Sequence, residues 1–117
     1  MKIKKSNLHK FCKDGSTRDD LVMDEPVSIE FIKYLSNFGE VKIREGMRMT
    51  PFSFDKPDFI SIKGILGDDE IEMRVKKEFQ RETSGYFDLL LFNYNDGTPD
   101  VNAMRGREAE IRAKIEE

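Results

Sequence analysis

Residues 57–79 read PDFISIKGILGDDEIEMRVKKEF, and this stretch decides the fold. Apolar and polar side chains alternate along it in two runs, and successive side chains of a strand point to opposite faces of a sheet. Between the runs, Gly67 and Asp68 suit a two-residue turn, because glycine adopts a positive φ without steric cost. The stretch therefore predicts a β-hairpin with one buried face.

The length of the turn decides which residues of the hairpin face each other. A two-residue turn sets Ile62 opposite Met73 on the buried face. On the other face it sets Lys63 opposite Glu72, and such a pair of opposite charges is worth ~0.2–1 kcal/mol. A four-residue loop would instead place Lys63 opposite Arg74, where like charges repel. We therefore expect the shorter turn.

Two further stretches have the start signals of a helix. Asp24 is a suitable N-cap residue, and Pro26 is suited to the first turn of a helix. Apolar side chains then recur at helical spacing, and together these signals predict a helix over residues 25–38. Thr98 and Pro99 repeat these signals for a second helix, which continues to the end of the sequence. A predicted helix therefore lies on each side of the hairpin along the chain.

Two other segments are predicted to be strands. Residues 40–50 alternate between apolar and basic side chains, and residues 86–94, YFDLLLFNY, are apolar on both faces, as in a central strand. Residues 51–57 contain two prolines and are predicted to be a loop. Residues 1–24 are polar and poorly periodic, so we expect a partly irregular N-terminal arm in which Ser6 caps a short helix.

The predicted order of helix, four strands and helix indicates an α+β fold. We expect residues 1–117 to form a single domain. Its sheet would be four-stranded, antiparallel and meander-like, with the N- and C-terminal helices packed on one face. The opposite face of the sheet would stay open. A chain of this length buries roughly 65% of its unfolded surface, which is enough for one core.

The composition is typical of a soluble protein. Charged residues make up 37% of the chain, mean hydropathy is -0.62, and no apolar run approaches the ~18 residues of a membrane span. No apolar segment follows the basic stretch at residues 1–5, so we expect no secretory signal. The single cysteine excludes an internal disulfide. We therefore expect a cytoplasmic protein that does not bind membranes.

The net charge of -3 conceals two segments of opposite charge. Residues 1–18 contain six Lys or Arg and one acid, whereas residues 19–30 contain five acids and no base. The two segments either neutralise each other in the fold or leave a basic arm free for an anionic partner. The sequence leaves both interpretations open.

His9 and Cys12 are the candidates for metal binding or nucleophilic catalysis. Both residue types bind zinc, but a structural zinc site takes four ligands and the chain has no other His or Cys. A catalytic Cys also needs a third group that orients its base, and no motif supplies one. We therefore expect no cofactor and no catalysis. A small metal protein or enzyme centred on His9 and Cys12 is retained as an alternative.

The open face of the predicted sheet is the main candidate for a binding site. Alternation places basic and aromatic side chains there together, and such faces bind single-stranded nucleic acid by stacking bases on aromatic rings. A solvated face with cross-strand ion pairs would have the same pattern. The predicted members are Lys42, Arg44, Arg48, Lys63, Arg74, Lys76, Phe59, Tyr86, Phe92 and Tyr94.

These patterns favour a small, non-catalytic binding module. Its open face would hold a protein or an anionic partner, and single-stranded nucleic acid is one candidate for the latter. The alternative is a structural homodimer, or an assembly subunit, in which this face is the subunit interface.

Overall fold

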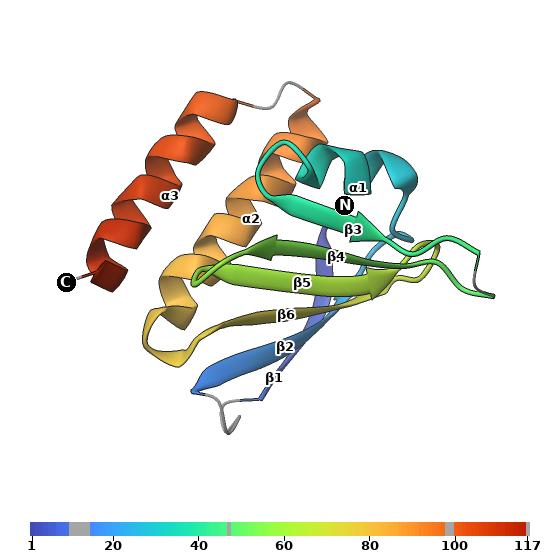
Figure 1. The fold of residues 1–117 in the computed structure, drawn as a ribbon, viewed down its shortest axis with the longest axis horizontal. Helices are drawn as coiled ribbons and strands as arrows, with labels where there is room; N and C mark the ends of the chain where they lie inside the picture. Colours follow the sequence, from blue (N-terminus) through green and yellow to red (C-terminus); the bar gives the residue numbers. More distant parts are fainter. Residues whose placement is uncertain (10–14, 47, 98–99, 117) are drawn as a thin grey trace.

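The computed structural model describes residues 1–9, 15–46, 48–97 and 100–116 and has an α+β fold (Figure 1). An antiparallel sheet of six strands is accompanied by a short helix and by two C-terminal helices. The strands are β1 Ile3–His9, β2 Ser16–Met23, β3 Glu40–Ile43, β4 Pro51–Lys56, β5 Ile60–Ile65 and β6 Glu70–Lys76. The helices are α1 Ile29–Leu35, α2 Gln80–Asp96 and α3 Val101–Glu116, and a short 3₁₀ helix, Lys77–Phe79, precedes α2.

The strands lie in the order β1-β2-β6-β5-β4-β3. β3 to β6 form a meander, of which the β5–β6 hairpin was predicted, and the β1–β2 hairpin joins it alongside β6. The predicted four-stranded sheet is therefore corrected to six strands. β1 and β2 come from the segment that was expected to be an irregular arm and β4 from a predicted loop, whereas the strand predicted over residues 86–94 is not part of the sheet.

β2 is hard to recognise in the sequence because polar residues occupy two of its buried positions. The residues of β2 that face the core are Thr17, Asp19, Leu21 and Met23. Asp19 is buried, and its carboxylate accepts a hydrogen bond from Ser6 Oγ at 2.6 Å, which offsets part of the cost of burying a charge. The predicted short helix is wrong at Ser6, which lies within β1, and its continuation into residues 10–14 lies outside the described residues.

The predicted hairpin is confirmed, including its register. Ile62 pairs with Met73, and both side chains are buried. Lys63 lies opposite Glu72 on the other face as predicted, but the carboxylate of Glu72 pairs with Arg18 and Arg74 and not with Lys63. Gly67 has a φ of 88°, a left-handed conformation that favours glycine in the turn. The predicted two-residue turn differs in detail: β5 ends at Ile65, β6 begins at Glu70, and the backbone N–H of Asp68 donates to the carbonyl oxygen of Ile65 at 3.0 Å.

Residues 86–94 belong to helix α2 and do not form the predicted central strand. The buried side chains of α2 recur at helical spacing at Thr83, Tyr86, Phe87, Leu90 and Leu91. Leu89 and Phe92 lie between these positions and are half-buried and exposed, respectively. Because they are also apolar, the run looks uniform in sequence and its helical period is hidden.

Residues 51–56 form strand β4 where a loop was predicted. Phe52 and Phe54 both point into the core, as the alternation of a strand requires. Pro51 is the first residue of the strand and Pro57 follows its end, and both positions tolerate a missing backbone N–H. The strand predicted over residues 40–50 is shorter, ending at Ile43.

Helix α1 is shorter than the predicted helix over residues 25–38. Its cap is Ser28, whose Oγ accepts a hydrogen bond from the backbone N–H of Phe31 at 3.1 Å. The predicted cap, Asp24, instead accepts a hydrogen bond from the backbone N–H of Lys2 at 2.8 Å. Asp24 therefore fixes the start of β1 and not the start of the helix.

Helix α3, the predicted C-terminal helix, is attached to the sheet by a largely buried ion cluster. Lys56 Nζ lies 2.5 Å from Glu108 Oε1, and Arg112 Nε donates to Glu108 Oε2 at 2.8 Å. The Arg112 guanidinium also lies over the ring of Phe59, 5.0 Å from its centroid. The predicted start signal of this helix, at residues 98–99, lies outside the described residues.

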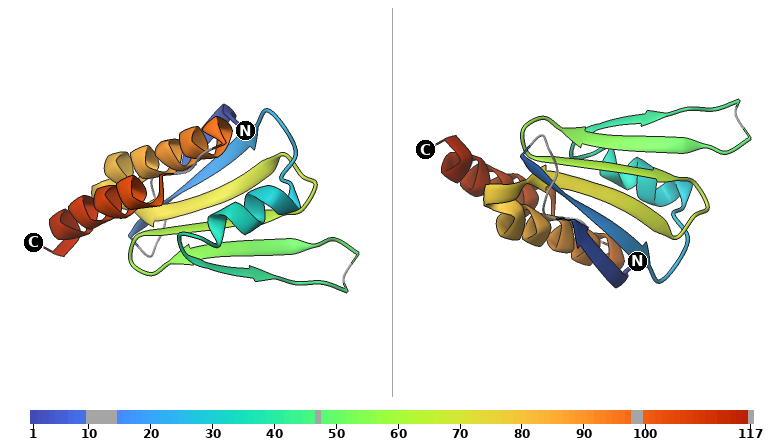
Figure 2. Two further views of the ribbon diagram at one scale, coloured as in Figure 1. Left: turned by 90° about the horizontal axis from the view of Figure 1, so that it is seen from above. Right: turned by 90° about the horizontal axis from the view of Figure 1, so that it is seen from below.

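All three helices cover the same face of the sheet (Figure 2). The core lies between the helices and the sheet, and its largest side chains include Phe31, Leu35, Phe54, Ile62, Met73, Tyr86, Phe87 and Leu90. In the described part of the chain, no helix covers the other face of the sheet. None of the described helices is long and apolar enough to cross a membrane.

Candidate binding face

The candidate site is the sheet face that the helices leave uncovered, which we call the open face. Ile62 and Met73 point toward the helices, so their neighbours Lys63 and Glu72 point away from them. The strand pairing extends this assignment across the sheet. The charged members of the open face are Lys5, His9, Arg18, Asp20, Glu70, Glu72, Arg74, Lys76, Lys63, Asp55, Lys42 and Glu40.

Most of the predicted basic residues lie on the open face or at its border. The strands carry four of them, namely Lys42, Lys63, Arg74 and Lys76. Arg44 follows β3 directly and lines a hollow together with Lys42 and Lys63. Arg48 is exposed between β3 and β4 and belongs to neither strand.

The predicted aromatic residues do not lie on the open face. Phe59 and Tyr86 are buried in the core, where their rings meet edge to face with centroids 5.0 Å apart. Tyr94 lies on α2 and packs against Phe31 at 5.0 Å. Phe92 is 67% exposed but also belongs to α2, on the helix side of the sheet. Their expected placement is corrected because residues 86–94 are helical, and the open face is left without these stacking surfaces.

A network of ion pairs occupies the centre of the open face. Arg18 and Arg74 lie directly opposite each other on β2 and β6. Glu72 lies 3.8 Å from Arg18 Nε and 3.3 Å from Arg74 Nε. Asp20 lies 3.5 Å from Arg18 Nε and 3.1 Å from His9 Nε2. The charges of the central strands therefore largely compensate each other.

Arg18 and Asp20 were missed as members of the open face. Both lie in the segment interpreted as an irregular arm, so no face was assigned to them. The available signal was the apolar run Leu21–Met23 at the end of β2, from which a period of two extends backwards through Asp19 and Thr17.

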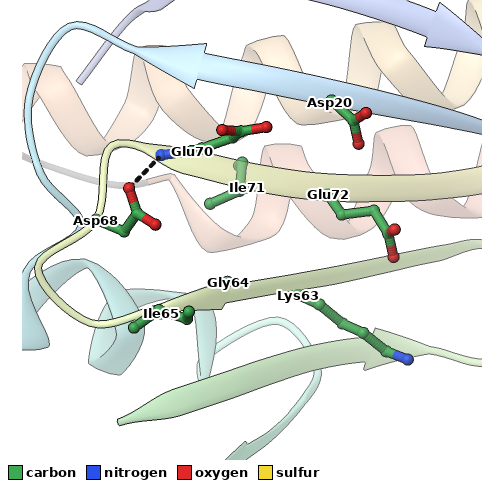
Figure 3. Close-up of a pocket in the computed structure, with 8 residues that line it drawn as sticks. All are labelled: Asp20, Lys63, Gly64, Ile65, Asp68, Glu70, Ile71 and Glu72. Atoms are coloured by element: carbon green, nitrogen blue, oxygen red, sulfur yellow. Dashed lines mark hydrogen bonds between the residues drawn. The ribbon is translucent and has the colours of Figure 1, made fainter. Parts of the chain in front are cut away.

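Three hollows on the open face are all lined by Lys63. The first, of about 390 Å³, is surrounded mainly by acids, and Figure 3 shows Lys63 extending from β5 over β4 beside it. The second, of about 210 Å³, is lined by Glu40, Lys42, Ser53, Asp55, Ser61 and Lys63. The third, of about 360 Å³, is lined by Lys42, Arg44, Pro51, Phe52, Ser53, Lys63 and Gly64. Lys63 thus lies where acidic and basic surroundings meet.

The open face therefore has two differently charged parts. We call Asp20, Glu70 and Glu72 the acidic half, and they line the first hollow. We call Lys42, Arg44 and Lys63 the basic corner, and they line the third hollow. Lys42 Nζ lies 3.7 Å from Glu40, in a pair of two highly exposed side chains. Within the described residues, the side chains of Arg44 and Lys63 have no ion-pair or hydrogen-bond partner.

The described residues do not provide a geometry that tests the metal hypothesis centred on His9 and Cys12. Cys12 lies outside the described residues, and the imidazole of His9 contacts Asp20. Among the residues that the structure describes, no group of three or more His, Cys, Asp or Glu side chains could hold a metal ion.

Comparison with known proteins identified no relative of this chain. No protein-family model matches the sequence, and no curated protein or solved structure matches the chain. The open face is therefore interpreted from its own residues.

Proposed function

We propose that this chain is a non-catalytic binding module whose open face holds an acidic protein partner. The observation that carries the proposal is the basic corner. Arg44 and Lys63 line the same hollow as Lys42 and, among the described residues, have no acidic partner of their own. A carboxylate of the partner would meet cations from β3 and β5 there, and charge-assisted hydrogen bonds are stronger than neutral ones.

The charge pattern supports a protein partner over single-stranded nucleic acid. A nucleic acid laid across the central strands would meet cations, Arg18 and Arg74, that already pair with Asp20 and Glu72, and its phosphates would also approach the carboxylate of Glu70. The aromatic rings that would stack bases lie in the core or on α2. A protein surface presents both signs, so its basic side chains can pair with the acidic half while its carboxylates enter the basic corner.

A homodimer is the second candidate, and the same charge pattern favours it. One face carries both the acidic half and the basic corner, so it is complementary to a copy of itself. A two-fold axis through the face would set each part against the opposite part of the second copy. The chain would then serve as a structural subunit.

Charge reversal of the basic corner tests the proposal. The double variant Arg44→Glu, Lys63→Glu should bind a labelled short oligoglutamate peptide about tenfold more weakly at low salt, which corresponds to about 1.4 kcal/mol. The matched control, Lys33→Glu with Arg105→Glu, reverses two exposed charges on α1 and α3 and should bind as the wild type does. Fluorescence anisotropy measures the affinities, and NMR chemical shifts should respond to the peptide in β3–β5. Equal affinity of the corner variant and the control would contradict the proposal.

Two further measurements separate the alternatives. If a labelled oligonucleotide binds more tightly than the peptide, the partner of the open face is a nucleic acid and not a protein. Sedimentation of the wild type as a dimer, and of the corner variant as a monomer, would favour the homodimer. In that case, mixing the corner variant with Glu70→Lys, Glu72→Lys should restore a heterodimer, because the reversed charges become complementary again.

A further inference from the structure

Strand β1 forms one edge of the sheet. In the described part of the chain, β2 is the only strand that pairs with it, so the backbone groups on its outer side face no strand. Lys4 and Lys5 belong to β1, Lys2 precedes it, and residues 1–9 contain no acid. The basic arm noted in the sequence is therefore a strand edge with a cationic border.

The neighbouring acidic segment neutralises this edge only in part. His9 Nε2 lies 3.1 Å from Asp20 Oδ2. The ammonium groups of Lys2, Lys4 and Lys5, by contrast, pair with no carboxylate among the residues that the structure describes. These three side chains are exposed, so positive charge remains available along the outer edge.

The start of β1 lies beside the end of α2 (Figure 2), and a hollow with apolar and polar lining residues lies there. The amino group of Met1 donates a hydrogen bond to Asn95 Oδ1 at 2.6 Å, which joins the two elements. The hollow has a volume of about 350 Å³ and is lined by Met1, Lys2, Ile3, Asp88, Leu91, Phe92 and Asn95. Phe92 is 67% exposed, the largest exposed fraction among the described large apolar residues.

We propose that β1 pairs with an extended acidic segment of a partner protein, which adds a further strand to the sheet. In such pairing the main chain supplies the affinity and alternate side chains supply the specificity. Side chains of the segment on the open side would be acidic, beside Lys5 and His9. Those on the helix side would be apolar, and one of them would enter the hollow beside Ile3 and Phe92.

The lysines that favour an acidic segment disfavour a second copy of this chain. Antiparallel pairing of two β1 strands along Lys5–His9 would place Lys5 of each copy opposite His9 of the other, so no carboxylate would meet the lysines, because residues 1–9 contain no acid. Lysine on an edge strand is a common protection against self-association. The register shift between Ile3 and Lys5 makes the first part of the edge irregular, so the partner segment would pair with Lys5–His9 and continue past the irregularity to place its end at the hollow beside Ile3.

A labelled peptide of about eight residues, alternating glutamate with valine, tests the proposal. Wild-type protein should bind it at low salt, as measured by fluorescence anisotropy. Lys4→Glu with Lys5→Glu should weaken binding about tenfold, and Phe92→Ser should weaken it several-fold. Both variants change exposed side chains, so circular dichroism should show an unchanged fold. The same peptide with N-methyl groups on alternate residues should not bind, because it cannot complete the strand pairing.

The control is Lys33→Glu with Arg105→Glu, which reverses two exposed charges on α1 and α3 and should bind this peptide as the wild type does. Loss of binding in Arg44→Glu, Lys63→Glu, with retention in Lys4→Glu, Lys5→Glu, would assign the peptide to the open face and overturn the inference. Equal affinity for the N-methylated peptide would also overturn it, since main-chain pairing would then play no part. A wild type that binds no peptide would overturn it too, and a dimer that persists in Arg44→Glu, Lys63→Glu but not in Lys4→Glu, Lys5→Glu would identify the occupant of the edge as a second copy.

Discussion

The covered face and the open face of the sheet each carry a cluster of ion pairs, and the two clusters differ in their contact with water. On the covered face, Lys56 and Glu108 are 8% and 19% exposed and lie 2.5 Å apart. On the open face, the side chains of Arg18, Asp20, Glu72 and Arg74 are between 26% and 38% exposed, and their pairs span 3.3 to 3.8 Å. Removing one partner from a buried ion pair leaves the other charge buried without compensation, which is strongly destabilising. Exposed ion pairs, by contrast, contribute little to the free energy of unfolding. The same residue types therefore fix the fold on one side and remain available for partners on the other.

The largest expected effect comes from breaking the cluster on the covered face. Glu108→Gln should lower the free energy of unfolding by about 3 to 5 kcal/mol, because Lys56 remains buried without its counter-charge. Urea denaturation followed by circular dichroism measures this. The matched control is Glu110→Gln on the same helix, whose side chain is 68% exposed and pairs with Arg107 at 3.0 Å. The control should stay within about 0.5 kcal/mol of the wild type.

The pH dependence of stability provides a second measurement on Glu108. Burial raises the pKa of this carboxyl, but hydrogen bonds from Lys56 and Arg112 more than offset this and hold it below its ordinary value of 4.5. A lowered pKa contributes stability that is present above the ordinary value and is lost as the pH falls through the lowered one. The wild type should therefore lose more stability in acid than Glu108→Gln does. Equal losses in the two proteins would show that the cluster is well hydrated.

The second prediction concerns two buried tyrosines. The loss of stability on removing each hydroxyl should depend on whether that hydroxyl has a hydrogen-bond partner. Tyr34 OH donates to the carbonyl oxygen of Leu90 at 2.9 Å, whereas Tyr86 OH is buried without a partner among the described residues. Tyr34→Phe should cost about 1 kcal/mol, and Tyr86→Phe should be neutral or stabilising. Thermal unfolding of both variants checks this. A larger loss for Tyr86→Phe would show that its hydroxyl has a partner, and would make the covered face more polar than the comparison assumes.

Alkaline titration of the same variants sharpens this prediction. Burial raises the pKa of Tyr34 to about 12, and burial together with the charge of Glu108 raises the pKa of Tyr86 as well. A raised pKa means that the contribution to stability is complete below the ordinary value of 10.0 and is lost as the pH rises through the raised value. Each Phe variant should therefore lose less stability than the wild type above pH 10.

The hairpin could be predicted from sequence because local and tertiary preferences agree there. Ile62 and Met73 alternate with charged neighbours, and Gly67 supplies the turn. β2 could not be predicted, because Thr17 and Asp19 occupy buried positions and interrupt the apolar alternation. The burial of Asp19 is stabilised by the hydrogen bond from Ser6 on β1. This contact forms only in the tertiary structure, so the sequence does not show it.

Residues of the candidate site could be predicted only where the strands that carry them were predicted. Lys42, Lys63 and Arg74 were placed on the open face by the period of two. The aromatic residues were misplaced because a helix with apolar residues on several faces resembles a buried strand, as Phe92 on α2 illustrates. The basic corner also depends on Arg44, whose position beside Lys63 follows from the end of β3.

The smallest expected effect is on the open face. Glu72→Gln removes a carboxylate that lies between Arg18 and Arg74, which face each other across β2 and β6. Asp20 remains beside Arg18, and water reaches all of these side chains, so the loss should be about 0.5 kcal/mol or less. Raising the salt concentration should reduce the difference further, because exposed charges are screened.

Urea denaturation of Glu72→Gln at two salt concentrations, beside Glu108→Gln, measures the contrast between the faces directly. A loss as large as that of Glu108→Gln, insensitive to salt, would mean that the open face is shielded from water in solution. Only a second molecule on this face would provide such shielding, so sedimentation of the same sample should then show a dimer. A small, salt-sensitive loss in a monomer would leave the open face hydrated and accessible, as the proposed binding of an acidic partner requires.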